Sequence, residues 1–197
     1  MSWLIVVTGH PGSGKSTLAD RLSRDLNIPV WHRDDFKEIL FDTLGSPSVA
    51  DSGRLGGSSW ALIHYAAKTL MCCRLPVILE ANYSPVPGRD EIRSLLDTYA
   101  YQALELIVEA PAAVLATRFQ RRIADGTRHP GHHDDERLME MTLRVMEPYE
   151  PLAVTDHLRH VDTSLPDAAV YPALLRWIRE HLERPSQPPR HEDARLR

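Results

Sequence analysis

Residues 3–17 read WLIVVTGHPGSGKST, and this stretch decides the fold. The mainly apolar run at residues 3–8 predicts a strand that is buried on both faces of a parallel sheet. The next residues, from Gly9 to Ser16, match the pattern G-x-x-x-x-G-K-[ST] at every fixed position. Leucines then recur every four residues and predict an amphipathic helix over residues 16–26. A strand, a glycine-rich loop and a helix in this order predict a phosphate loop.

The residue types of this loop suit a nucleotide triphosphate. Glycines let successive backbone N–H groups point at phosphate oxygens, and the helix start adds its positive end. The Lys15 ammonium would reach the β- and γ-phosphates, and the Ser16 hydroxyl would bind Mg²⁺. We therefore predict ATP and Mg²⁺ as cofactors. The expected cofactor-binding residues of the loop are Gly12, Ser13, Gly14, Lys15, Ser16 and Thr17.

Four more apolar runs follow, with helical patterns between them. The runs lie at residues 28–31, 76–79, 103–108 and 158–161. Helical spacing marks residues 16–26, 34–44, 55–74, 88–100, 111–124, 134–147 and 167–183. Strands that alternate with helices predict right-handed crossovers and a parallel sheet covered on both faces. The expected fold class is α/β, a three-layer αβα sandwich of the P-loop NTPase type with a five-stranded parallel sheet.

The chain of 197 residues suits a single domain, which we expect over residues 1–184. Residues 45–59 are rich in Gly, Ser and Pro and predict a mobile loop between two helices. Residues 125–136 contain breakers suited to a lid that closes over the nucleotide. Prolines and charged residues dominate residues 185–197, which predicts a disordered tail.

Composition limits the partners and the compartment. A formal net charge of −4 argues against a long nucleic acid as the main partner, because such binders usually carry a basic surplus. No segment reaches the ~20 apolar residues of a membrane span. The adjacent Cys72 and Cys73 fit reduced thiols better than a bridge between neighbours. We expect a cytoplasmic protein, either a monomer or a homodimer.

Three carboxylates follow predicted strands. Asp34 and Asp35 come after the second run and Glu80 after the third. Because parallel strands open their carboxyl ends on one edge, we expect all three near the γ-phosphate. Asp34 is the candidate base that accepts the proton of an attacking hydroxyl, while Asp35 would touch the substrate or cap the next helix. Glu80 takes the Walker-B position and would hold Mg²⁺ together with Ser16.

Arginines gather before and within the predicted lid. Arg118 and Arg122 lie four apart on one helix face, and Arg128 follows them. Guanidinium groups stabilise the spread charge of a transferring phosphoryl group. Arg118 and Arg122 are therefore candidate catalytic residues and Arg128 a candidate nucleotide contact; a solvated basic helix face is the alternative. Polar lid contacts, and not a zinc site, are expected of His129, His132 and His133.

These motifs resemble those of small P-loop kinases, such as polynucleotide 5′-hydroxyl kinase domains, zeta-type toxins and chloramphenicol phosphotransferase. The resemblance covers residues 3–165 and is closest to the polynucleotide kinase domain at residues 9–17 and 33–37. It implies the sheet order 2-3-1-4-5, Asp34 as general base and Lys37 as its basic partner on the acceptor side. The acidic–small–Asn sequence at the third strand end matches residues 80–82.

The chain also departs from the polynucleotide kinase pattern. It has no appended phosphatase domain with a D-x-D motif, and its net charge is negative. Its lid, residues 128–132, is more similar to that of stand-alone bacterial predicted kinases that are described only as ATPases. These departures leave the acceptor open and do not affect the predicted phosphoryl transfer.

The sequence thus predicts an ATP-dependent kinase that acts on a hydroxyl of a small molecule or of a nucleic-acid 5′ end. Its acceptor site is expected in variable loops at residues 45–60 and 83–93. A regulatory ATP-binding protein or ATPase without an acceptor is the alternative, since fold alone does not fix function. The chain lacks a guanine-reading N-K-x-D motif, which favours ATP over GTP. The expected substrate contacts are Asp35, Lys37, Asn82, Tyr83 and Arg89.

Overall fold

The computed structural model describes residues 2–45, 48–126, 129–133 and 138–183. They form one five-stranded sheet in the order β2-β3-β1-β4-β5, and every neighbouring pair of strands is parallel. The strands are β1 (Trp3–Thr8), β2 (Val30–His32), β3 (Val77–Glu80), β4 (Gln102–Glu109) and β5 (Leu158–Asp162). The predicted fold class and the strand order are therefore confirmed.

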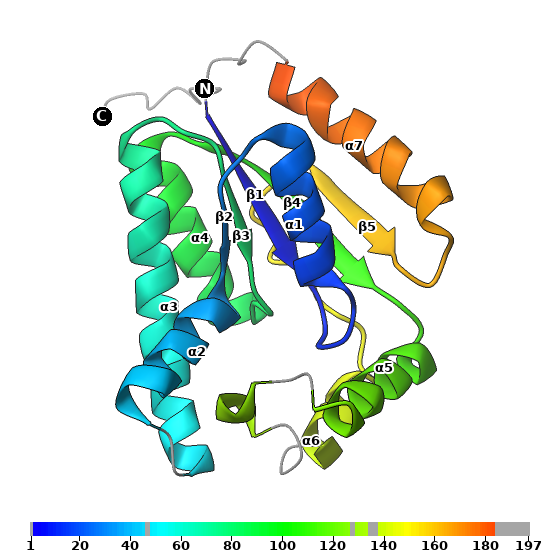
Figure 1. The fold of residues 1–197 in the computed structure, drawn as a ribbon. Helices are drawn as coiled ribbons and strands as arrows, with labels where there is room; N and C mark the ends of the chain where they lie inside the picture. The colour runs from blue at the N-terminus through cyan, green and yellow to red at the C-terminus, as the bar shows by residue number, and fades with distance from the viewer. Residues whose placement is uncertain (1, 46–47, 127–128, 134–137, 184–197) are drawn as a thin grey trace, which may run out of the picture.

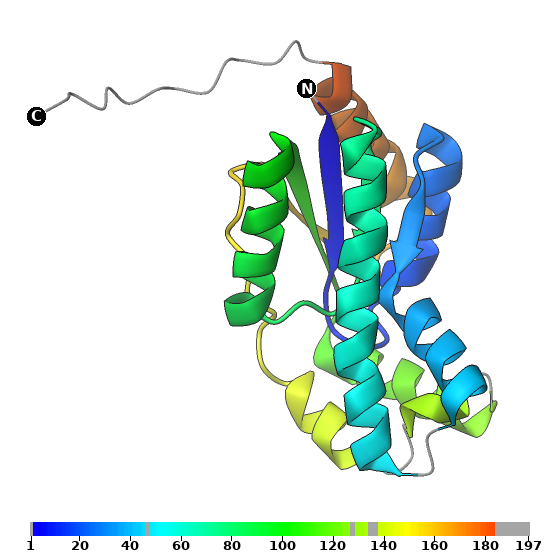
Figure 2. The same ribbon diagram turned by 90° about the vertical axis from the view of Figure 1, so that its left-hand side faces the viewer.

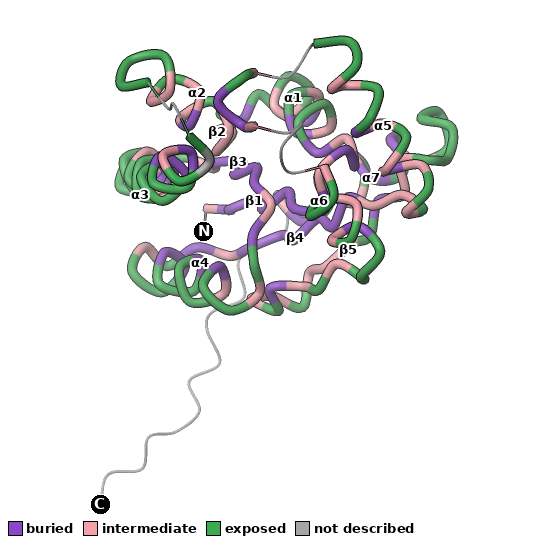
Figure 3. Tube along the Cα trace, turned by 90° about the horizontal axis from the view of Figure 1, so that it is seen from below, coloured by how far each residue is buried: buried purple, intermediate pink, exposed green. Residues whose placement is uncertain are grey.

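Two pairs of helices cover the two faces of the sheet (Figures 1 and 2). One face carries α3 (Val49–Cys72) and α4 (Pro85–Tyr99), and the other carries α1 (Lys15–Leu26) and α7 (Asp167–Glu183). Side chains of β1 alternate between two apolar cores: Leu4 and Val6 enter the first, Ile5 and Val7 the second. Burial on both sides, visible along the central strands in Figure 3, explains the continuous apolar run.

The remaining helices gather at the carboxyl edge of the sheet, at the bottom of Figure 1. They are α2 (Arg33–Leu44), α5 (Ala112–Ala124), the 3-10 helix η1 (Pro130–His132) and α6 (Leu138–Arg144). Glu80 at the end of β3 is in register with Val7 of β1 and with His32 of β2. The phosphate loop, which leaves β1 two residues after Val7, therefore starts beside Glu80.

The prediction of a loop over residues 45–59 is wrong from Val49 onward, where α3 begins. The Ser48 side chain caps this helix by accepting a hydrogen bond from the Asp51 N–H at 3.2 Å. Glycines in the first two turns each cost about 0.5–1 kcal/mol relative to alanine. Packing of α3 against α2, α4 and β3 outweighs that intrinsic cost, because tertiary contacts supply most of the stability of a helix.

Other boundaries shift by a few residues. Helix α4 begins at Pro85 and not at residue 88, since a proline in the first turn needs no N–H donor. The described helix α6 stops at Arg144, short of the predicted end at residue 147; residues 134–137 and the tail at 185–197 lie outside the described part. Within the described ranges, no helix is long and apolar enough to cross a membrane.

Candidate active site

The phosphate loop has the backbone geometry that anion binding requires. At Gly9 φ is +144°, and a Cβ atom there would lie 2.1 Å from the carbonyl oxygen of Val108. Gly14 caps α1 in the left-handed region with φ +91°, and no side chain occupies the helix N-terminus as a cap. Within the described chain, the buried Ser13 hydroxyl has no hydrogen-bond partner. Free donors around a helix N-terminus fit a chain of phosphates.

Lys15, Ser16 and Glu80 meet at the start of α1. The Lys15 ammonium donates to the carbonyl oxygen of His10 at 3.0 Å and lies 3.9 Å from the Glu80 carboxylate. The Ser16 hydroxyl donates to Glu80 Oε2 at 3.3 Å. Two protein oxygens beside the phosphate loop fit Mg²⁺, which keeps several waters and takes its other ligands from phosphates. The predicted partners Ser16 and Glu80 are thus brought together.

His32 holds Glu80 from the other side. Its Nδ1 lies 2.9 Å from Glu80 Oε2, and its Nε2 lies 2.9 Å from Asp20 Oδ1. Burial lowers the pKa of His32, but the hydrogen bonds to Glu80 and Asp20 and the charges of Glu80 and Asp35 outweigh it and raise the pKa to about 9. The imidazolium is therefore the form that orients the Glu80 carboxylate. This role was not predicted, because the chain separates His32 from Glu80 by 48 residues.

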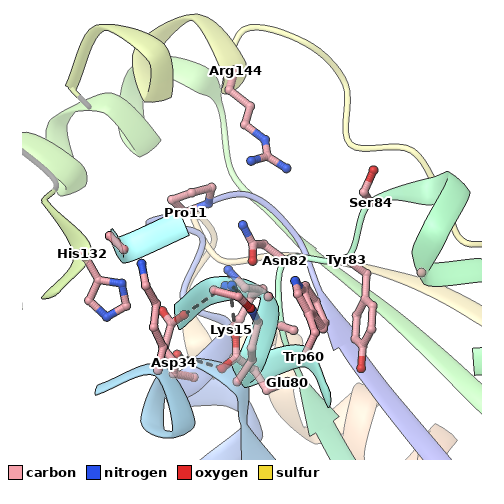
Figure 4. A pocket seen from close by; sticks show the side chains of 18 of the residues that line it. Pro11, Lys15, Asp34, Trp60, Glu80, Asn82, Tyr83, Ser84, His132 and Arg144 are labelled. Carbon is pink, nitrogen blue, oxygen red and sulfur yellow. Dashed lines mark hydrogen bonds and ion pairs between the residues drawn. The ribbon is translucent and has the colours of Figure 1, made fainter. Parts of the chain in front are cut away.

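A cavity of about 410 Å³ lies in front of the phosphate loop (Figure 4). Lys15, Ser16 and Glu80 line one side of it, and Asp34 and Lys37 line another. The Asp34 carboxylate lies 3.7 Å from Arg33 Nη1, and its side chain is 36% exposed. Of the predicted acceptor contacts, Lys37, Asn82 and Tyr83 line this cavity. One space therefore joins the candidate base to the phosphate loop.

Two other predicted substrate contacts do not line this cavity. Burial raises the pKa of the Asp35 carboxyl, the charge of His32 opposes that shift, and Glu80 adds to it. Asp35 thus lies within the electrostatic reach of His32 and Glu80 behind the cavity wall. The Arg89 guanidinium donates from Nε to the carbonyl oxygen of Leu152 at 2.7 Å, so it braces a loop on the outer side of α4.

A second cavity, of about 430 Å³, adjoins the first and shares Gly12 and Arg122 with it. Thr17 and Arg118 line it, as do the first turns of α7. The Arg118 guanidinium donates at 2.8 Å to both the hydroxyl and the carbonyl oxygen of Thr163. Arg118 is therefore fastened to the loop after β5, while Arg122 reaches both spaces.

The described part of the predicted lid, residues 129–133, docks on α2. His129 Nε2 lies 3.1 Å from Asp42 Oδ1, and His132 Nε2 lies 2.8 Å from Glu38 Oε1. Both carboxylates belong to α2, and His132 lines the first cavity beside Asp34 (Figure 4). Residues 129–133 therefore lie against α2 at the first cavity; closure of the lid over the nucleotide stays a prediction. Arg128 lies outside the described residues.

Sequence reasoning did not name four residues of the cavity wall as site residues, although three of them lie in the predicted acceptor loops or lid. They come from four elements: Trp60 from α3, Glu91 from α4, His132 from η1 and Arg144 from α6. Trp60 also packs against Arg33, whose guanidinium lies above its ring at 4.6 Å. None carries a local motif, so only the arrangement of the helices reveals these residues.

Comparison with solved structures supports a kinase. The "putative kinase" of Chloroflexus aurantiacus J-10-fl is 31% identical, with a TM-score of 0.81 over 92% of this chain and 98% of that one. A gluconokinase from Sinorhizobium meliloti 1021 is 20% identical over 92% and 94%, with a TM-score of 0.59. The APS kinase of Mycobacterium tuberculosis, solved with AMPPNP and APS, is 19% identical over 90% and 97%, with a TM-score of 0.56. The last two show the fold alone.

A short match to a curated protein points the same way. It is 78% identical over 23 residues to the ATP-dependent kinase YFH7 of Eremothecium gossypii, and it spans 12% of this chain and 7% of that protein. Fold, phosphate loop and neighbours together define a small P-loop kinase of the ATP-dependent type. Within that class, the chain belongs to the AAA domain family, whose model matches residues 4–148.

Proposed function

We propose that this protein transfers the γ-phosphate of ATP to a hydroxyl group of a small molecule. A single observation carries the proposal: the Asp34 carboxylate and the phosphate-loop residues Lys15 and Ser16 line the same cavity. A nucleotide held only for regulation needs no carboxylate facing its terminal phosphate.

The chemistry follows from this arrangement. An acceptor hydroxyl between Asp34 and the γ-phosphate gives its proton to the Asp34 carboxylate as its oxygen forms the new O–P bond. The bond from the γ-phosphorus to the bridging oxygen breaks, and its electron pair leaves with ADP. Lys15 and Arg122 stabilise the negative charge on the transferring group. Mg²⁺ bound by Ser16 and Glu80 would supply charge neutralisation between the β- and γ-phosphates.

The shape of the first cavity favours a small acceptor over a nucleic-acid end. Residues of α2, α3, α4, η1 and α6 line it, so helices enclose the acceptor side from several directions. Its volume of about 410 Å³ also includes the space in front of the phosphate loop. Such a space suits a ligand of small-molecule size, between 300 and 1,000 Å³ for typical sites.

The second cavity suits the nucleoside of ATP. It begins at Gly12 and Thr17, beside the loop that would hold the phosphates, and its far wall is apolar, with Val170 and Leu174. Contact with apolar walls of this kind would favour binding of the aromatic adenine ring. The adenine ring of ATP and the acceptor would then lie on opposite sides of the phosphate loop.

Replacing Asp34, the proposed general base, tests the proposal. Asp34→Asn removes the proton acceptor and keeps the shape, so acceptor-stimulated ADP release should fall by about 10²–10⁴-fold while ATP affinity stays unchanged. The matched control is Asp97→Asn, because Asp97 is an exposed α4 carboxylate that does not line the cavity.

The readout is ADP release with a panel of hydroxyl compounds, together with ATP titration by calorimetry. Turnover retained in the Asp34→Asn protein would refute the base assignment. Slow hydrolysis that no hydroxyl compound stimulates would instead favour a regulatory ATPase.

A further inference from the structure

Arg144 is a charged cavity residue that the proposed mechanism does not use. It is the last residue of α6, and its half-buried guanidinium points into the first cavity from the side opposite Asp34 (Figure 4). Of the carboxylates in the described chain, none forms an ion pair with it. A partly desolvated guanidinium without a counter-charge is costly unless a ligand supplies the anion.

The chain that follows Arg144 after α6 is fastened to the cavity wall through Tyr149. The Tyr149 hydroxyl donates to the carbonyl oxygen of Tyr83 and lies 2.5 Å from the Thr8 hydroxyl. Thr8 Oγ1 in turn accepts the Tyr83 N–H at 3.2 Å. Because the only proton of the Tyr149 hydroxyl goes to Tyr83, Thr8 must donate to Tyr149, and the three groups form a closed ring of hydrogen bonds. This ring joins the end of β1 to the cavity wall.

A second tie fastens the same segment to the phosphate loop. His10 Nε2 lies 2.9 Å from the carbonyl oxygen of Glu147, and the His10 ring meets the Tyr149 ring edge-on at 5.0 Å between centroids. Burial lowers the pKa of His10, and the Glu147 hydrogen bond opposes that shift. The imidazole therefore remains neutral and serves as a structural contact. Residues 147–149 are thus fixed to Thr8 and His10, on either side of Gly9, where the phosphate loop begins.

We propose that Arg144 binds an anionic oxygen of a ligand in the first cavity, and that Tyr149 and His10 act as positioning residues for it. The inference rests on the proposed function, because the ligand is ATP or its acceptor. The anion has two possible sources: the γ-phosphate of ATP, or a carboxylate or phosphate group on the acceptor. Arginine suits either, since its planar fork pairs with two oxygens at once.

The first arm of the test compares two nucleotides. Calorimetry gives the affinities of the magnesium complexes of AMP-PNP and ADP for the wild type, Arg144→Met and the control Arg54→Met. Arg54 is a matched arginine whose side chain is 82% exposed on α3 and pairs with Asp51. If the γ-phosphate is the source, Arg144→Met weakens AMP-PNP about tenfold or more and leaves ADP and the control unchanged.

The second arm tests the acceptor as the source. Thermal stabilisation of the protein with MgADP is measured for matched pairs of hydroxyl compounds, such as glycerate against glycerol and a sugar phosphate against the free sugar. An acceptor source predicts that the wild type prefers the anionic member of a pair and that Arg144→Met loses this preference. The proposal is overturned if Arg144→Met matches the wild type in both arms.

The positioning role has its own readout. Tyr149→Phe keeps the ring against His10 but removes the hydroxyl that joins Thr8 to Tyr83. It should shift the same nucleotide ratio or acceptor preference as Arg144→Met, by a smaller factor, whereas a general loss of stability would weaken all ligands alike. An unchanged selectivity would refute the positioning role. Failure of the wild type to bind either nucleotide would instead refute the proposed function.

Discussion

His64 shows how burial can decide the charge of a single residue. Its imidazole stacks beside Trp60 and Tyr83, two residues that line the first cavity, and 12% of its side chain is exposed. Glu91 Oε2 lies 3.7 Å from its Nε2, which would favour the charged ring. Burial nevertheless lowers the pKa of His64 to about 4, with the charge of Lys68 adding to the effect. Burial also raises the pKa of Glu91, which disfavours its charged form, so the ion pair between His64 and Glu91 is weak.

This pKa predicts a pH dependence of stability. Between pH 6.5 and about 4 the unfolded chain binds a proton at His64 that the folded protein does not, so stability falls as the pH falls through this window. The loss is on the order of 3 kcal/mol at its limit. Urea unfolding from pH 7.5 to 4.5 should show the wild type losing about 2–3 kcal/mol relative to His64→Phe, which keeps a ring there.

An ion pair with Glu91 would produce the opposite trend. The wild type would then gain stability relative to His64→Phe as the pH falls through 6.5. That result would show that the carboxylate, and not burial, controls the charge of His64.

At the scale of elements, η1 is seated on α2 by close packing at one glycine. A Cβ atom on Gly131 would lie 2.7 Å from ring atoms of Phe41. The Gly131 carbonyl oxygen accepts a hydrogen bond of 2.8 Å from the hydroxyl of the buried Ser52. The sequence predicted a lid here from its breakers. It did not predict the docking surface, because Phe41, Ser52 and Gly131 come from three separate elements.

We predict that Gly131→Ala lifts η1 from α2. The added methyl group cannot share space with the Phe41 ring, and overpacking of this kind costs about 1–3 kcal/mol. Hydrogen exchange should therefore become faster at the backbone amides of residues 131–133, while the sheet stays protected. Adding Phe41→Ala to the same chain supplies room and should restore slow exchange. Equal exchange in the wild type and Gly131→Ala would contradict the docked arrangement.

At the scale of the whole molecule, the sheet was predictable and the cavity walls were not. Residues 3–7 are apolar without interruption because α1, α3, α4 and α7 bury both faces, and that pattern is local in the sequence. Strand order came from the resemblance to P-loop kinases. The meeting of Lys15, Ser16 and Glu80 could be predicted because the loop after β1 and the end of β3 lie at the same edge of the sheet. Trp60 and Arg144 could not, because packing of separate helices places them.

Nucleotide binding should stabilise the whole domain. At a concentration of 100 times its Kd, Mg·AMP-PNP adds about 2.7 kcal/mol to the free energy of unfolding. For a domain of this size that raises Tm by about 5–10 °C. Differential scanning calorimetry should show this rise for the wild type and its loss in Lys15→Ala, whose own Tm without nucleotide is the control. An equal rise in both proteins would show that the nucleotide binds elsewhere.

The two cavities adjoin each other, because Gly12 and Arg122 line both. A bisubstrate molecule, with adenosine tethered to a hydroxyl compound through a chain of phosphates, can therefore occupy both sides at once. Its second half would bind at the high local concentration set by the tether. In a library of such conjugates that differ only in the hydroxyl compound, the measured affinities would rank the candidate acceptors, even where each one alone binds weakly.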